Sequence, residues 1–439
     1  MKTLFTNHKR NIIIAAGLSL ILLLGVGGAA VVYTQQAGNA NPFRWPYNQP
    51  TGIEFEHGDI YQAWQDWKSV QITSANTDGQ NRLRVMGGVD NQTTVSEGQA
   101  YGLLFASIFD DQPTFDGLWL FATDHSGSNG LMDWHIGEPG QRLGTGATTD
   151  ADEDMALALV NACIKVRQEA WPPSPEGIDY CAAATNLINA IYRYEVDHPG
   201  ETGANGLNDN PGYELLPGDQ WNFAAEYPNG IVNLSYFSPG YYPVFGKFTN
   251  NLAAWTAVKE RNYEIVSQVQ ARPDNCSGLV PNWNQYSGDP QFVAWQPNNH
   301  DWWSYDAARL AWRVAVDQYW HNTDSSQQVI NKIGGFFNSV GLENLGGEYN
   351  LSGQAVGDGS RPFFVANAAA AIWAAPDPHP IACGDAAGQL KLSPQQAYEA
   401  VLSSQDSPNS YYGNAWRLFA LLLMSGNFPN FYEMGEVSQ

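Results

Sequence analysis

Positive charge is scarce in this sequence of 439 residues. Lys and Arg together number 21, against 44 Asp and Glu, so the formal net charge is −23. Because binding to nucleic acid depends on Lys and Arg at the phosphates, nucleic acid is not an expected partner. An anionic polysaccharide would be repelled as well. A neutral polymer is compatible with this charge, and a cationic polymer is not excluded.

Cysteine is also rare. The four cysteines are Cys163, Cys181, Cys276 and Cys383. Their spacing fits neither a CxxC pair nor a Cys/His zinc pattern, so no zinc site is expected. Four cysteines can form two disulfides in three ways, and the spacing does not choose among them. Free buried thiols are equally compatible with the sequence.

Several catalytic signatures are missing. The chain has no GxSxG, no HExxH, no P-loop and no GxGxxG that follows a strand, and its eight His are scattered singly. Nucleophilic-serine, metal-dependent and nucleotide-dependent chemistry therefore lack support, and we expect neither a metal nor a cofactor. A linker rich in Ser, Thr or Pro is missing too, which predicts one domain over residues 41–439.

The amino terminus has the pattern of an export segment. Basic residues within the first ten positions precede an apolar run at residues 12–33. The run is long enough to cross a bilayer, which takes about 20 apolar residues. A small-x-small cleavage site follows at Gly38–Ala40. We predict that residues 1–40 are a signal peptide or signal anchor, and that the rest of the chain is secreted or periplasmic.

Helical periodicity dominates the remainder. Strands that alternate with helices are not evident, which disfavours Rossmann and (β/α)8 folds. About a dozen helices joined by long loops predict an all-α domain of stacked helical hairpins. Apolar residues at spacings of three and four predict helices over Ser96–Asp110, Asp116–Asp124, Asp150–Gln168, Ala182–Val196, Asn250–Gln270, Tyr305–His321, Gln327–Val340, Arg361–Ala374, Pro394–Ser404 and Tyr411–Ser425.

Aromatic residues are abundant. The chain has 16 Trp, 21 Tyr and 19 Phe, more than a core usually needs. Most of them are expected to be core residues. The flat faces of Trp and Tyr also suit the apolar faces of sugar rings.

Glu97 is the first candidate carboxylate. Ser96 has the character of a helix N-cap, which places Glu97 in the first turn of an apolar helix. An acidic residue there is favourable to the helix dipole and needs no catalytic purpose. The adjacent Gly98 and Gln99 would allow close approach and a hydrogen bond.

A second group of carboxylates opens another helix, in the stretch TDADED at residues 149–154. Helix capping explains these residues without any function. A calcium loop is a weak alternative, because Met155 stands where such a loop requires Gly. The third interpretation directs one carboxylate into a sugar-binding cleft.

The third candidate is Asp306, in the stretch WWSYDAAR. Asp306 and Arg309 are spaced to form an ion pair on a helix. The pair is either a simple salt bridge at a helix start or a device that keeps the carboxylate ionised, as a general base requires. Two carboxyl groups are the minimum apparatus for cleaving a glycosidic bond.

Five segments in order now resemble glycoside hydrolase family 8. They lie between residues 92 and 430 and read SEGQAYGLLFA, TDADEDMALALVNA, VNLSYFSPGYYPVF, WWSYDAARLAWRVAVD and YYGNAWRLFALLLMSGNFPN. The resemblance implies an (α/α)6 barrel, hydrolysis with inversion, and an open cleft for an extended chain. Members of this family act mainly on β-1,4-glucans, and others cut xylan, mixed-linkage glucan or chitosan.

The resemblance also implies roles for single residues. Glu97 matches the proton donor of the family and Asp306 its general base. Asp150 matches the carboxylate that binds and distorts the central sugar. Tyr305 and Arg309 match the neighbours that hold the base and its water.

Aromatic positions complete the expected site. Trp134 and Trp221 resemble stacking platforms for sugar rings, and Tyr412 resembles a further cleft residue. Gln220 stands where some cellulases of the family have Arg, which leaves the exact polysaccharide open. We therefore expect a monomeric, inverting, endo-acting hydrolase of an extended β-1,4-glucan. The alternatives are the same chemistry on xylan, mixed-linkage glucan or chitosan, and a non-catalytic glycan-binding protein of the envelope.

Overall fold

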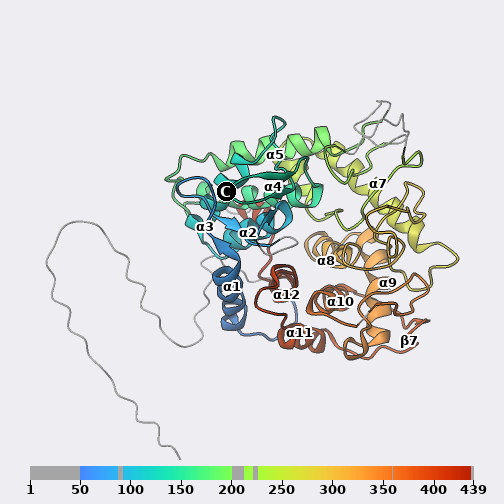
Figure 1. Cartoon of the computed structure of the whole chain (residues 1–439). Helices are drawn as coiled ribbons and strands as arrows, with labels where there is room; N and C mark the ends of the chain where they lie inside the picture. The colour runs from blue at the N-terminus through green and yellow to red at the C-terminus, as the bar shows by residue number, and fades with distance from the viewer. Residues whose placement is uncertain (1–49, 88–91, 200–211, 221–225, 358, 437–439) are drawn as a thin grey trace, which may run out of the picture. The chain divides into compact units, whose positions relative to one another are not determined.

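The computed structural model describes most of the chain after the amino-terminal segment (Figure 1). The predicted export segment and Trp221 lie outside the described residues. Among the residues that are described, no helix is long and apolar enough to cross a bilayer. The described residues are 50–87, 92–199, 212–220, 226–357 and 359–436.

Helices form nearly all of the regular structure, as predicted. Within the described ranges three small antiparallel sheets accompany them: β1 and β2, then β3 to β5, then β6 and β7. The helices of the described residues are α1 His57–Gln71, α2 Ser96–Ile108, α3 Gln112–Asp124, α4 Thr149–Arg167, α5 Tyr180–Tyr194, α6 Tyr242–Phe248, α7 Leu252–Gln270, α8 Arg309–His321, α9 Asp324–Val340, α10 Pro362–Ala374, α11 Pro394–Ser403, α12 Tyr411–Met424 and α13 Phe431–Glu436. The strands are β1 Ile72–Thr73, β2 Arg84–Val85, β3 Thr94–Val95, β4 His135–Ile136, β5 Arg142–Gly144, β6 Ala382–Cys383 and β7 Ala386–Ala387.

The helices form an inner and an outer layer. In α2, α4 and α12 nearly every residue is buried. The sequences of α2 and α12 are apolar on most sides, whereas α4 also buries the carboxyls of its first turns. Helices such as α5 bury only one stripe, which includes Ala184, Ile188 and Ile191 at helical spacing. The helices that are buried on all sides therefore form the inner layer, and the amphipathic helices cover them.

The inner helices close into a ring. Helix α2 packs on α4, α8 packs on α10, α10 packs on α12, and α12 returns to α2. Arg313 of α8 joins the remaining side of the ring, since it pairs with Asp154 of α4 and donates to Tyr241 Oη next to α6. Helix α1 lies against α12, so the first helix of the domain packs beside a helix from its carboxyl-terminal part (Figure 1). This arrangement confirms the predicted (α/α)6 barrel.

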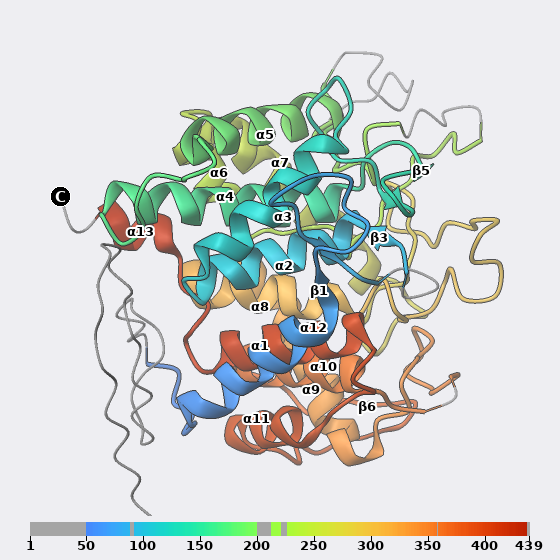
Figure 2. The same cartoon turned by 60° about the vertical axis from the view of Figure 1, so that its left-hand side comes forward.

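The long connections and their short strands surround the candidate site. In Figure 2 the segments with β3 and β5 extend from the same side of the helices. Strand β4 pairs with both β3 and β5. The backbone N–H of Ser96, at the start of α2, donates to the carbonyl of Trp134 at 3.0 Å. The small sheet thus places the segment that carries Trp134 beside the first turn of α2.

The starts of several helices differ from the sequence predictions. Ser96 is not an N-cap: it is the first residue of α2, and its hydroxyl lies 3.0 Å from that of Thr148. Helix α3 begins at Gln112, because Asp111 caps it by accepting from the Thr114 N–H. Residues 305–308 form turns, and α8 begins only at Arg309.

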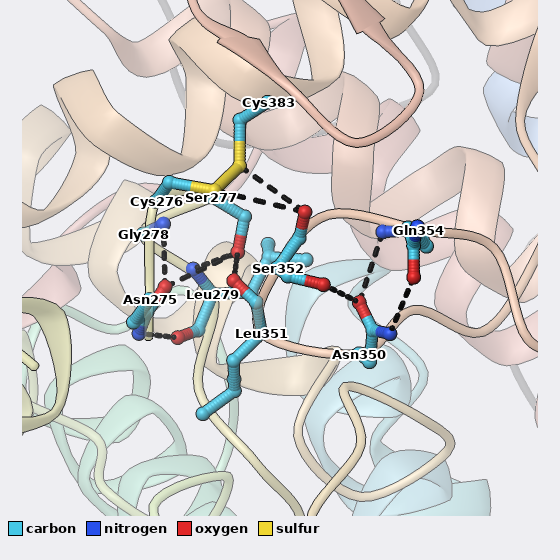
Figure 3. Close-up of a disulfide and its surroundings, with 10 residues drawn as sticks. All are labelled: Asn275, Cys276, Ser277, Gly278, Leu279, Asn350, Leu351, Ser352, Gln354 and Cys383. Atoms are coloured by element: carbon cyan, nitrogen blue, oxygen red, sulfur yellow. Dashed lines mark hydrogen bonds between the residues drawn. A yellow bond between two sulfur atoms is a disulfide. The ribbon is translucent and has the colours of Figure 1, made fainter. Parts of the chain in front are cut away.

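The four cysteines form two disulfides. Cys163 pairs with Cys181 and joins α4 to α5, across a separation of 18 residues. Cys276 pairs with Cys383 and joins the loop after α7 to β6, across 107 residues. Figure 3 shows the second disulfide beside the carbonyl of Ser352, whose oxygen lies 3.3 Å from the Cys383 sulfur. One of the three possible pairings is therefore selected, and the free-thiol alternative is wrong.

Removing the long-range disulfide is expected to destabilise the fold. Without it the unfolded chain gains the entropy of a large open loop, so Cys276→Ala/Cys383→Ala should lower the free energy of unfolding by about 2–5 kcal/mol. Urea denaturation measures this loss. A reducing agent should then destabilise the wild type more than the double variant. Identical unfolding curves for the variant and the wild type would contradict the prediction.

Candidate active site

A buried arginine is the centre of the candidate site. The Arg309 side chain is only 2% exposed and contacts three carboxylates, which come from α2, from α4 and from the turn before α8. Its Nη1 lies 2.5 Å from Glu97 Oε2 and 2.7 Å from Asp150 Oδ2. Its Nη2 lies 3.4 Å from Asp306 Oδ1 and donates to Ser235 Oγ at 2.9 Å. The structure therefore brings together all three carboxylates that the sequence singled out.

Glu97 lies in the first turn of α2, close to Tyr411 of α12. The Tyr411 hydroxyl donates to Glu97 Oε1 at 3.1 Å. This contact requires small residues around the tyrosine ring. A Cβ added at Gly98 would lie 3.3 Å from the ring, and one added at Gly87 would lie 2.8 Å from it. Glycine at these positions lets the ring approach the start of α2.

Gln99 fixes the first turn of α2. Its side chain is fully buried and accepts from the Val85 N–H at 2.9 Å. The same amide donates to the carbonyls of Leu83 and Leu118, at 3.1 and 2.9 Å. These bonds tie α2 to β2 and α3. Gln99 therefore holds the first turn of α2, which carries Glu97, in place.

The acidic stretch at the start of α4 divides among different partners. Only Asp150 contacts Arg309, and its other oxygen accepts from the Ala151 N–H at 2.9 Å. Asp154 pairs with Arg313 inside the ring. Asp152 and Glu153 are fully buried, where burial raises the pKa of each carboxyl, that of Glu153 to about 8. One carboxylate of this stretch thus points into the candidate site, and the others lie in the core.

Asp306 lies in the turn before α8 and is held from two sides. Arg309 contacts Oδ1, and Gln296 Nε2 donates to Oδ2 at 2.7 Å. The Asp306 side chain is 20% exposed and that of Glu97 is 19% exposed, whereas Asp150 is 3% exposed. Glu97 and Asp306 can therefore meet a substrate or a water molecule, above a buried layer of Arg309 and Asp150.

The pKa values of the two accessible carboxyls are both perturbed. Burial raises the pKa of Glu97 to about 7, although the charge of Arg309 opposes the rise. Burial also raises the pKa of Asp306, and there Arg309 and the hydrogen bond from Gln296 oppose it. Glu97 can therefore hold a proton near neutral pH, as a general acid must.

The described members of the predicted aromatic set adjoin the segments that carry these carboxyls. Trp134 adjoins the start of α2, and its side chain is 40% exposed. Tyr305, also 40% exposed, stacks on Phe363 with ring centroids 5.6 Å apart. Tyr412 is half-buried and donates to the Tyr305 carbonyl at 2.8 Å. Trp134 and Tyr305 thus offer accessible aromatic surface, as sugar platforms must, while Trp221 lies outside the described residues.

Four contact residues were missed by the sequence analysis. Tyr411 adjoins Tyr412, which was predicted. Ser235 and Tyr236 belong to the segment VNLSYF, whose individual side chains carry no obvious chemistry. The Arg309 guanidinium lies over the Tyr236 ring, 5.2 Å from its centroid. Gln296 lies in a long loop without periodicity, so no sequence signal could have identified it.

Comparison with known proteins assigns the family. The pattern of Glycosyl hydrolases family 8 matches residues 53–426. Endoglucanase 2 of Ruminiclostridium josui is 35% identical over 384 residues, which cover 87% of this chain and 74% of that protein. Endoglucanase A of Acetivibrio thermocellus is 32% identical over 424 residues, which cover 94% of this chain and 80% of that protein.

A solved structure supports the fold. The β-1,3-1,4-glucanase of Paenibacillus sp. X4 superposes with a TM-score of 0.70 at 23% sequence identity, over 89% of this chain and 96% of that one. The family pattern covers most of the chain, and the barrel agrees with it. The chain belongs to glycosyl hydrolases family 8 and is a glycosidase.

Proposed function

We propose that this protein is an inverting, endo-acting hydrolase of β-1,4-linked glucan, with Glu97 as general acid and Asp306 as general base. One observation carries the proposal: different nitrogens of the Arg309 guanidinium contact the two carboxyls. An inverting enzyme needs its carboxyls roughly 6.5–9.5 Å apart, so that a water molecule fits beside the base. The shared guanidinium brings both carboxyls to one point of the site, and inversion itself is proposed on the resemblance to family 8.

The reaction is a direct displacement. The protonated Glu97 gives its proton to the glycosidic oxygen as the bond from that oxygen to the anomeric carbon breaks. Asp306 takes a proton from a water molecule on the opposite face of the sugar, and the water oxygen forms the new bond to the anomeric carbon. The product has inverted configuration, and the two carboxyls exchange protonation states, which solvent then restores.

Asp150 and the aromatic residues would bind the chain. Asp150 is held by Arg309 and by the Ala151 N–H directly beneath Glu97 and Asp306. Its role as a contact of the central sugar is proposed on the resemblance to family 8. Trp134 and Tyr305 would contact sugar rings on the two sides of the cleavage point. We propose Trp221 as a further platform, on the resemblance alone.

The glucan assignment rests on the two endoglucanases, which are more similar in sequence to this chain than the β-1,3-1,4-glucanase is. The β-1,3-1,4-glucanase with the same fold makes mixed-linkage glucan the second candidate. Product release from cellulosic, mixed-linkage, xylan and chitosan substrates, compared side by side, separates these. NMR of the anomer formed first from a soluble cello-oligosaccharide tests inversion. Binding without any product would instead support the non-catalytic alternative, and a retained configuration would refute the mechanism.

The pH dependence should show the proton on Glu97. Because the acid must be protonated and its pKa is about 7, kcat/KM should fall about tenfold per pH unit above pH 7. Initial rates on a soluble glucan from pH 4 to pH 10 measure this limb. A rate that stays constant up to pH 10 would show that no group with this pKa acts as the acid.

We also propose that residues 1–40 direct export. Two disulfides are typical of proteins in oxidising compartments, which supports a secreted or periplasmic location. Detection of the amino terminus in the exported protein, by mass spectrometry, distinguishes a cleaved signal peptide from a retained anchor.

A further inference from the structure

Gln296 contacts the proposed base, Asp306, from a loop that lies outside the five segments that resemble family 8. Its Nε2 donates to Asp306 Oδ2 at 2.7 Å, while Arg309 contacts Oδ1. Both carboxylate oxygens therefore have a donor, and each keeps lone-pair capacity for a water molecule. The two contacts together fix the plane of the carboxylate.

Two donors determine which end of the Gln296 amide faces Asp306. Trp283 Nε1 donates to Gln296 Oε1 at 3.0 Å, and Asn282 Nδ2 donates to the same oxygen at 3.3 Å. A flipped amide would place its NH2 against these two donors and its oxygen against the Asp306 carboxylate. Donor would then face donor and acceptor would face acceptor, so the flipped amide could form neither hydrogen bond. The amide therefore has one favourable orientation.

The donors themselves are rigid. The side chains of Asn282 and Trp283 belong to residues only 1% and 4% exposed. Asn282 Oδ1 also accepts from the Ala307 N–H at 2.9 Å, directly after Asp306 in the chain. Asn282 therefore connects Gln296 to the turn that carries Asp306 through hydrogen bonds to both.

We propose that Gln296 is a positioning residue that orients Asp306 and keeps it ionised, so that Asp306 can take a proton from the attacking water. The inference rests on the proposed role of Asp306 as the general base. A donor to a carboxylate favours its charged form, so Gln296 counteracts the burial of Asp306. The other charged or titratable groups that influence Asp306 are Arg309, Asp150, Glu97, Tyr236 and Tyr412.

The decisive variant is Gln296→Met, which keeps the length of the side chain and removes the donor. We expect kcat to fall about tenfold, KM to change little, and the acid limb of kcat/KM to move up by about one pH unit, because a charged hydrogen bond is lost. Trp283→Phe removes one of the two donors that orient the Gln296 amide. It should move the acid limb of kcat/KM up as well, but by less than Gln296→Met.

Gln291→Met is the matched control in the same loop. The Gln291 amide donates to the Phe292 carbonyl at 2.9 Å and contacts no carboxylate in the described part of the chain. Its pH profile should equal that of the wild type. If Gln296→Met also retains the wild-type acid limb and kcat, while Asp306→Asn is inactive, this inference fails and the proposed function stands. If Asp306→Asn remains active, the assignment of the base fails instead.

Discussion

Glu97→Gln is expected to lower kcat on a β-1,4-glucan by about 10²–10⁴-fold, the contribution of a positioned general acid. Gln keeps the size of the side chain and can still accept from the Tyr411 hydroxyl, but it has no proton to give the glycosidic oxygen. Gln has one acceptor oxygen where Glu97 has two, so Arg309 loses a partner but retains Asp150 and Asp306. The fold should therefore survive, and initial rates on cello-oligosaccharides measure the loss.

The nature of the leaving group makes this test specific. An aryl cello-oligosaccharide with a dinitrophenyl leaving group needs no proton, so Glu97→Gln should cleave it at a rate much closer to the wild type. Glu260→Gln is the matched control, because Glu260 is exposed on α7. Equal losses on both substrates would show that Glu97 is not the acid, and full activity on the glucan would show the same.

Asp306→Asn is expected to reduce kcat by a similar factor of about 10²–10⁴. Asn is nearly isosteric, but it cannot take a proton from the attacking water. Because water must still be activated whatever the leaving group, the loss should be as large on the dinitrophenyl substrate as on the glucan. Rates on both substrates therefore distinguish the base from the acid.

The control for Asp306→Asn lies five positions earlier in the chain. Asp301 is exposed, and Asp301→Asn makes the same chemical change outside the carboxylate cluster. That variant should keep wild-type rates on both substrates. A dinitrophenyl substrate that rescues Asp306→Asn would contradict its role as the base.

The sequence predicted the centre of the site better than its surroundings. The spacing of Asp306 and Arg309 predicts their contact, since residues three apart lie on one face of a helical turn. Glu97 and Asp150 lie far from them in sequence, and no local pattern predicts that both reach Arg309. Only the resemblance to family 8 joined these positions.

The boundaries of several helices show where periodicity fails. Helix α1 buries Ile60, Ala63, Trp64 and Trp67 at helical spacing, so its signal was present, although it was not among the predicted helices. Helix α6 has seven residues, too few for a periodic pattern to emerge. Gln296 and its donors depend on the path of a long loop, which tertiary contacts determine.

The core carboxyls of α4 make folding a reaction that consumes protons. Burial raises the pKa of Asp152 and of its neighbour Glu195 well above the ordinary range, and that of Glu153 to about 8. In the unfolded chain these groups release their protons near about pH 4. The native state therefore binds more protons between pH 4 and pH 8, and by linkage its stability declines as the pH rises through that window. Through these buried carboxyls, the free energy of unfolding should be higher near pH 4 than near pH 8.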